Sequence, residues 1–235
     1  MAEEISYPHP EHHSNLSGFV RNVIIGMADG LTVPFAIAAG LASAGAATST
    51  IVIAAVLAEI AAGSISMGLG GFLATKTEHD HYFAERAREE WEVENKPADE
   101  EQEVVDALRK YGLSREESAS VAASIKTRKK DWVDFMMRFE LGLEEPDDRE
   151  ALWSAVTIGG SYIVGGLIPL TPYLLIHSVY TAFFTSIGVT LLALIIFGYL
   201  RGYFVGNRPI RSMIQTVLVG SIAAFAAFIL AKLAS

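Results

Sequence analysis

Five apolar stretches constrain the fold of this chain more than any other feature of its sequence. Each of them, if it forms a helix, is about long enough to cross a membrane. A helix needs about 20 mostly apolar residues to cross the hydrocarbon core of a bilayer. A soluble domain of this size would have to bury five helices that are apolar on every side. The sequence therefore predicts an all-α membrane protein with five transmembrane helices per subunit. The stretches are residues 19–41, 51–74, 151–170, 177–200 and 212–234.

Charged residues are concentrated in one segment of the chain. Residues 76–150 hold 22 of the 27 acidic and 13 of the 18 basic residues, and no acid follows Glu150. This composition predicts a water-exposed insert between spans 2 and 3. The chain has no Cys, which excludes disulfides and thiolate metal sites. Its net charge of −9 argues against a nucleic-acid partner.

The basic residues outside the insert indicate the orientation of the spans. Arg21 flanks the first span, and Arg201, Arg208 and Arg211 follow the fourth, whereas only Lys232 falls on the opposite side. The positive-inside rule then places the N-terminus and the insert in the cytosol, with the C-terminus lumenal. The predicted organisation is a disordered tail over 1–15, spans 1 and 2 over 16–75, the insert over 76–148, and spans 3–5 over 149–235.

The insert is predicted to contain three helices. Neither Gly nor Pro occurs between the end of span 2 and Pro97, so span 2 should continue into the insert as one long helix. A second helix follows and stops at Gly112. Ser114 opens the capping-box sequence SREE and begins a third helical region, with a break near residues 126–130 and an end at Gly142.

Acidic residues and methionines in the insert are spaced so that they share helix faces. Residues three or four apart lie on one face, and Glu-x-x-Glu pairs on facing helices can build a carboxylate cage for a divalent ion. Thioether sulfur shifts such a site toward transition metals and away from Ca²⁺ and Mg²⁺. The alternatives are a solvated run of charges and methionines that only fill a core. The candidate ligands are Glu89, Glu92, Glu100, Glu103, Met136, Met137 and Glu140.

Asp29 and Glu59 are the acids within the apolar spans, where a charged side chain costs several kcal/mol. A carboxyl group in a low dielectric can hold either a proton or a metal ion, so the two compete. This competition predicts a proton-coupled cation path, while a neutral, hydrogen-bonded carboxyl is the structural alternative. Met67, two turns after Glu59, is predicted to line the same path. Pro34 should free the Gly30 carbonyl as a further oxygen ligand.

Three longer strings resemble the vacuolar iron transporter family, in its plant form with a cytosolic insert. They are GMADGLTVPFAIAAGL, AEIAAGSISMGLGGFLA and DFMMRFELGLEEPD. The resemblance implies a homodimer of five-span subunits that moves Fe²⁺ from the cytosol into the vacuole in exchange for protons. It also implies a pathway at the subunit interface lined by Asp29, Glu59 and Met67, and a metal-binding role for the Glu and Met residues of the insert.

Other functions remain to be separated from this one. Carboxylates discriminate weakly between Fe²⁺ and Mn²⁺, so Mn²⁺ is an alternative main substrate, and Co²⁺ and Zn²⁺ are further candidates. A membrane-anchored metal buffer or sensor is a second class, although an anchor has no need of Asp29 and Glu59. No arrangement of residues favours an enzyme, and no cofactor is expected beyond the bound or transported metal. The expected partners are metal ions, protons, membrane lipid and a second subunit.

Overall fold

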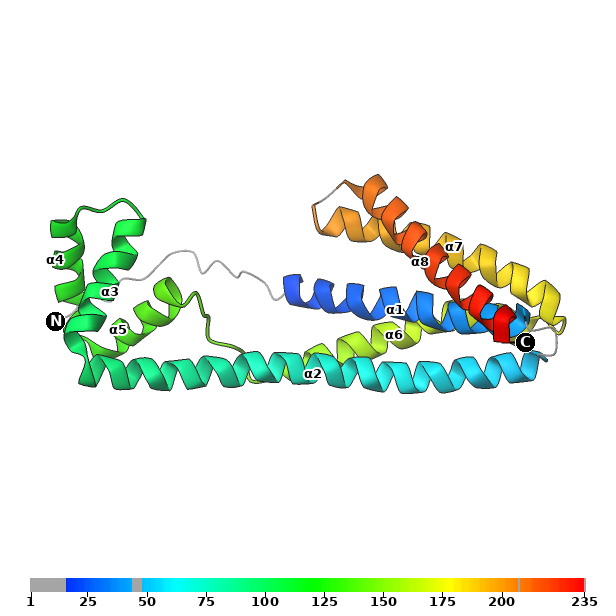
Figure 1. Cartoon of the computed structure of the whole chain (residues 1–235), viewed down its shortest axis with the longest axis horizontal. Coiled ribbons are helices and arrows are strands. Elements are labelled where there is room, and N and C mark those ends of the chain that lie inside the picture. Colours follow the sequence, from blue (N-terminus) through cyan, green and yellow to red (C-terminus); the bar gives the residue numbers. More distant parts are fainter. Residues whose placement is uncertain (1–15, 44–47, 207, 235) are drawn as a thin grey trace. The chain divides into compact units, whose positions relative to one another are not determined.

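The computed structural model describes residues 16–43, 48–206 and 208–234, which contain helices and no strand. The predicted tail over 1–15 and part of the first loop lie outside these residues. Figure 1 shows the helices in order along the chain. They are α1 (Leu16–Ser43), α2 (Ser49–Asn95), α3 (Pro97–Lys110), α4 (Arg115–Lys126), α5 (Lys129–Phe135), the π-helix η1 (Met136–Glu140), α6 (Glu150–Leu175), α7 (Val179–Phe204) and α8 (Pro209–Ala234).

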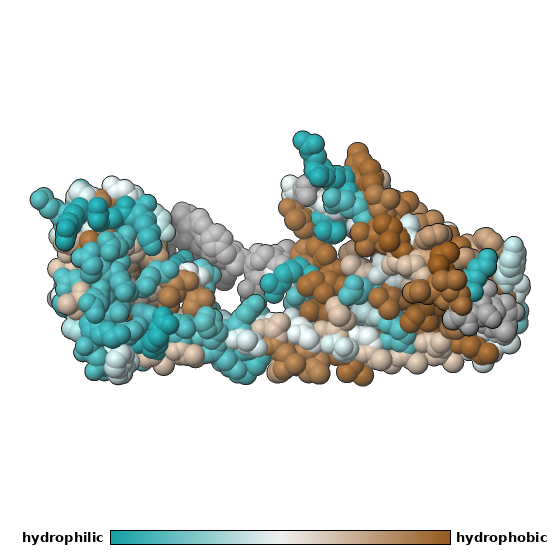
Figure 2. Space-filling view, viewed as in Figure 1, coloured by the Kyte–Doolittle hydropathy of each residue, from teal (hydrophilic) through white to brown (hydrophobic). Residues whose placement is uncertain are grey.

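The chain divides into two compact units. The first, called the membrane unit here, contains the residues up to Phe72 and those from Leu152 onward. The second, called the insert unit, is Leu73–Ala151. Figure 2 shows a surface of mainly hydrophilic residues on the insert unit and extensive hydrophobic surface on the membrane unit. The mainly hydrophilic surface and the extensive hydrophobic surface thus belong to different units of the chain.

The membrane unit contains five helices that are long and apolar enough to cross a membrane, namely α1, α2, α6, α7 and α8. The predicted number of spans is thus confirmed. Small buried residues let these helices approach closely. On α7 the buried residues recur every four positions, which places them on one face toward α1 and α8. They are Ala182, Ser186, Thr190, Leu194, Gly198 and Gly202.

The long helix predicted from span 2 is present, because α2 runs without interruption for 47 residues. Its residues up to Phe72 belong to the membrane unit and the later ones to the insert unit. Pro97 lies in the first turn of α3, where its missing N–H is not needed, so the chain restarts as a new helix there.

The insert unit differs in part from the three-helix prediction. The capping box forms as expected, with Ser114 and Glu117 each bonding the backbone N–H of the other. The region that follows breaks between α4 and α5 near residues 126–130, as predicted, but its last turn forms the π-helix η1. The backbone bond from Leu141 N to Met136 O, 3.1 Å long, spans five residues and marks the wide π turn. The predicted three-helix layout is therefore not confirmed.

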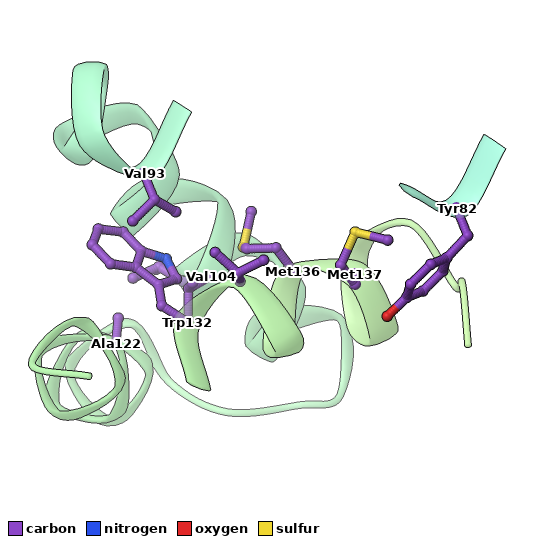
Figure 3. Packing of buried hydrophobic residues seen from close by; sticks show 9 residues of the cluster. Tyr82, Val93, Val104, Ala122, Trp132, Met136 and Met137 are labelled. Carbon is purple, nitrogen blue, oxygen red and sulfur yellow. The ribbon is translucent and has the colours of Figure 1, made fainter. Parts of the chain in front are cut away.

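A small apolar core holds the insert unit together. Figure 3 shows Trp132 between Val93 and Ala122, with Met136 beside Val104. Leu108, Ile125 and Phe135 pack against this core, whereas Val121 and Phe139 remain exposed. Helices from both ends of the insert thus contribute to one core, and this packing fixes the face of each helix that turns inward.

Candidate functional site

Three of the predicted ligands come together where α2 ends and α3 begins. One carboxylate oxygen from each of Glu89, Glu92 and Glu100 lies within 4.8 Å of the other two. Glu89 and Glu100 are buried, with exposed fractions of 2% and 3%. One oxygen of each, Oε2, is buried without a hydrogen-bond partner among the described residues. Buried polar atoms without partners are costly, and a bound cation would satisfy both of these.

Two further predicted ligands extend this group into a cluster of five carboxylates. The carboxyl groups of Glu103 and Glu140 share a hydrogen bond. Burial, followed by the negative charges of Glu103, Glu89, Glu92 and Glu140, raises the pKa of Glu100 to about 7. Burial, followed by the charges of Glu103 and Glu89, also raises the pKa of Glu140 to about 7. The cluster therefore accumulates unfavourable negative charge, which a divalent cation would relieve.

Two basic side chains partly neutralise the cluster. Arg88 lies 3.3 Å from Glu89 and 3.4 Å from Glu92, and the Lys96 ammonium lies 3.1 Å from the other oxygen of Glu92. Both basic side chains are about half exposed, so they can swing away when a metal ion takes their place. Arg88 was not among the residues predicted from the sequence to take part in this site. Its position four residues before Glu92 on the same helix is the feature of the sequence that could have predicted this contact.

Met136 and Met137 are fully buried in the core of the insert unit. Figure 3 shows both sulfur atoms on the same side of η1, with Met137 toward Tyr82. Glu140 is the last residue of this π-helix, so the three predicted ligands of the segment share one wide turn. Core packing accounts for the burial of both methionines, and their role as metal ligands stays a prediction.

The raised pKa values in the cluster predict an unusual pH dependence of stability. Glu100 is more easily protonated in the folded insert unit, near pH 7, than in the unfolded chain, near its ordinary value of 4.5. In the absence of metal, the contribution of Glu100 to the stability of the folded insert unit is therefore fully present below about pH 4.5. This stabilisation is lost as the pH rises to about 7. We expect a loss on the order of 2 kcal/mol over this range. Hydrogen exchange of α3 amides in the full-length protein, corrected for intrinsic rates, measures it.

Two controls accompany this measurement. Glu100→Gln should flatten the pH profile, because the amide cannot titrate, and saturating Mn²⁺ should restore protection at pH 7 in the unaltered protein. Protection of α3 that rises between pH 5 and pH 7 without metal would contradict the expected sign.

The membrane unit holds a second polar group, centred on a residue that the sequence analysis missed. Tyr162 of α6 is buried, with an exposed fraction of 2%, and its hydroxyl donates a hydrogen bond to Oε1 of Glu59. The other carboxyl oxygen of Glu59, Oε2, is buried without a partner among the described residues. The signal for Tyr162 was a lone phenol within an apolar span, since a buried tyrosine hydroxyl usually finds a partner.

Two glycines bring α1 and α2 against Tyr162. A Cβ added at Gly30 would lie 2.3 Å from the Tyr162 carbonyl oxygen, and one added at Gly63 would lie 2.4 Å from the hydroxyl oxygen. Neither space admits a side chain, so glycine permits the close approach at both positions. Because Asp29 adjoins Gly30 along α1, three helices meet at the level of the two intramembrane acids.

The other predicted residues of the path are half-buried. Asp29 and Met67 both have intermediate exposure, as does Glu59. The Asp29 carboxylate makes no hydrogen bond that involves another described residue. Pro34 lies within α1, so the Gly30 carbonyl lacks the amide donor that would otherwise come from that position. Asp29, Glu59 and the Gly30 carbonyl thus supply oxygen atoms that could coordinate a hard or borderline cation.

The hydrogen bond from Tyr162 predicts a measurable effect on Glu59. Tyr162→Phe removes the hydroxyl but keeps the ring that packs against Gly63. A hydrogen bond to a charged group contributes about 1.5–3 kcal/mol, so we expect metal uptake to fall roughly tenfold or more, with a shifted pH profile. Uptake into liposomes that contain the purified protein, measured across a pH series, tests this.

Tyr173→Phe is the matched control for this substitution. Tyr173 is a buried tyrosine of the same helix, and its hydroxyl has no hydrogen-bond partner among the described residues. We expect uptake by this variant to be unchanged. Equal losses in the two variants would assign the effect to packing rather than to Glu59.

Comparison with known proteins agrees with these features. A sequence profile described as the VIT family matches residues 20–232. Vacuolar iron transporter 1 of Oryza sativa subsp. japonica is 50% identical over 231 residues, covering 98% of this chain and 91% of that protein. Vacuolar iron transporter 1 of Arabidopsis thaliana is 51% identical, with 95% and 89% covered. Protein CCC1 of Saccharomyces cerevisiae is 39% identical, with 91% and 68% covered. The chain therefore belongs to the VIT family.

Proposed function

We propose that this protein transports Fe²⁺ from the cytosol into the vacuole in exchange for protons. The observation that carries the proposal is the pairing of Glu59 with Tyr162 inside an apolar helical unit. It leaves Oε2 of Glu59 buried and without a hydrogen-bond partner among the described residues. The similar proteins named vacuolar iron transporter support iron as the substrate and the vacuole as the compartment. Membership of this family also argues for a transporter rather than an enzyme.

The proposed cycle begins with capture of the metal in the insert unit. Glu89, Glu92 and Glu100 gather the ion at the near-neutral pH of the cytosol, with Glu103 and Glu140 adding charge. Met136 and Met137 are proposed to add thioether ligands, which favour transition metals over Ca²⁺ and Mg²⁺. This stage raises the local concentration of the substrate.

Transfer through the membrane unit is the second stage. The ion passes Met67 and is bound by deprotonated Asp29 and Glu59. Protons from the acidic lumen then compete for the same oxygen atoms and release the metal there. The hydrogen bond from Tyr162 holds one oxygen of Glu59, so the other remains directed to the ion. Each turnover therefore carries metal in one direction and protons in the other.

The proposal includes an orientation and a dimer. The N-terminus and the insert unit face the cytosol and the C-terminus faces the lumen, in accord with the positive-inside rule. Two subunits pair through their transmembrane helices, because a five-helix subunit makes a narrow path alone and a two-fold pair doubles the lining.

Uptake into liposomes that contain only the purified protein tests the function. With an acidic interior, Fe²⁺ kept reduced should enter, and a protonophore that collapses the pH gradient should stop entry. Parallel assays with Mn²⁺, Co²⁺ and Zn²⁺ then rank the substrates. Faster entry of Mn²⁺ than of Fe²⁺ would identify Mn²⁺ rather than iron as the main substrate. Metal binding without entry into the liposomes would identify a membrane-anchored metal buffer.

A further inference from the structure

A pocket at one end of the membrane unit, whose lining includes neither acid of the pathway, combines two arginines with apolar walls. It lies between the first turns of α1 and the last turn of α7 and has a volume of about 660 Å³. Arg21 and Arg201 contribute its charge, and Ile24, Ile25 and Phe204 are among its apolar residues. This volume is within the range of about 300–1,000 Å³ typical of small-molecule sites.

The two arginines have no anionic partner within the membrane unit as described. Neither guanidinium makes an ion pair or hydrogen bond with another described residue. Over the described ranges of this unit, Asp29 and Glu59 are the only acids, and both are assigned to the transport path. The pocket therefore offers two uncompensated positive charges, and an external anion would complement them.

The position of the pocket indicates what kind of anion would occupy it. The candidate spans begin at Gly18 in α1 and end at Phe204 in α7, so Arg21 and Arg201 lie at the edge of the apolar segments, at headgroup level in a bilayer. Phe204 and Ile25 remain exposed, at 65% and 38%, and supply apolar surface for an acyl chain. Basic pockets between transmembrane helices characteristically bind anionic lipid headgroups.

A second basic region adjoins the same turn of the chain. Arg208 and Arg211 line a neighbouring pocket at the start of α8, only a few residues after Phe204. Figure 2 shows hydrophilic residues gathered at the turn that joins α7 to α8, next to brown apolar surface. The positive charge at this end of the membrane unit thus extends beyond two side chains, as expected for a surface that contacts phosphate groups.

We propose that the pocket between α1 and α7 binds an anionic phospholipid, with the phosphate-bearing headgroup held by Arg21 and Arg201 and an acyl chain along Phe204 and Ile25. The guanidinium pair supplies bidentate donors for phosphate oxygens. The apolar wall distinguishes a lipid from a free anion of the same charge. Binding at this site is independent of the transport proposed above, since it uses none of the pathway residues.

Native mass spectrometry of the full-length protein in detergent tests the proposal. The probes are phosphatidylinositol phosphate, phosphatidylserine, phosphatidylcholine and soluble inositol phosphate. We expect the two anionic lipids to form adducts with the unaltered protein. The R21Q/R201Q variant should bind them with an affinity at least roughly tenfold lower. The matched control R109Q/K110Q removes two positive charges from the end of α3 and should bind as the unaltered protein does.

A second variant tests the contribution of the acyl chain to binding separately from that of the headgroup. Phe204→Ala should weaken binding of the long-chain lipid several-fold and leave any binding of soluble inositol phosphate unchanged. Three results would overturn the proposal: equal binding of phosphatidylcholine, anionic-lipid binding by R21Q/R201Q equal to that of the control variant, or soluble inositol phosphate binding as tightly as the lipid. The last result would assign the pocket to a small anion instead.

Discussion

Glu59→Gln is expected to abolish metal uptake by the protein. The amide keeps the size of the side chain and can still accept the hydrogen bond from Tyr162. It carries no negative charge and cannot exchange a proton for a metal ion. Removing one charge from a desolvated, hydrogen-bonded site costs about 2–5 kcal/mol, so uptake should fall by roughly 30-fold at the least. Initial rates of Fe²⁺ uptake into acidic-interior liposomes provide the measurement.

The control for this substitution is Glu150→Gln at the start of α6, because that acid is exposed and lies outside the polar group around Tyr162. Its uptake should match the unaltered protein. Asp29→Asn should reproduce the loss, whereas metal binding by the insert unit should be unchanged in all three variants. Normal transport by Glu59→Gln together with Asp29→Asn would exclude the proposed exchange at the intramembrane carboxylates.

The second large effect is expected in the insert unit, where the double variant Glu89→Gln/Glu100→Gln should lose high-affinity metal binding. These two residues are the buried members of the cluster, and each has one carboxylate oxygen without a hydrogen-bond partner in the part of the chain that the structure describes. Replacing two anionic ligands removes both charge and coordinating oxygens, so we expect binding at least about 100-fold weaker. Isothermal titration of the full-length protein with Mn²⁺ and Co²⁺ measures the change without the complication of iron oxidation.

Glu90→Gln/Glu101→Gln is the matched control, since it removes the same number of charges at the adjacent positions. Glu90 and Glu101 instead form ion pairs with Arg86 and Lys126. Binding by this control should stay within about twofold of the unaltered protein, because exposed ion pairs contribute little. Equal weakening of both double variants would mean that the cluster attracts metal only through its overall charge.

Much of the fold follows from composition and from simple helical rules. The five spans follow from the length of the apolar stretches, and the long α2 follows from the absence of Gly and Pro before Pro97. The grouping of Glu89 with Glu92 follows from their three-residue spacing. These features depend on neighbours in the sequence, so local reasoning predicts them.

Other features depend on contacts between distant segments and could not be predicted. The bond from Tyr162 to Glu59 joins residues 103 positions apart, and only the packing of α6 against α2 brings them together. The π-helix η1 was likewise not predicted, although the break between α4 and α5 falls within the expected residues 126–130.

The π-helix at Met136–Glu140 has a consequence for how this protein tolerates mutation. A turn that closes over five residues rather than four contains one residue more than ordinary winding would need. Deleting a single residue there would let the segment rewind into a regular α-helix of almost the same composition. Deletion of Arg138 or Phe139 would also leave Glu140 two positions after Met137 instead of three, a spacing that does not share a helix face. The placement of Glu140 relative to the two methionines thus depends on chain length, a property that side-chain replacement leaves intact.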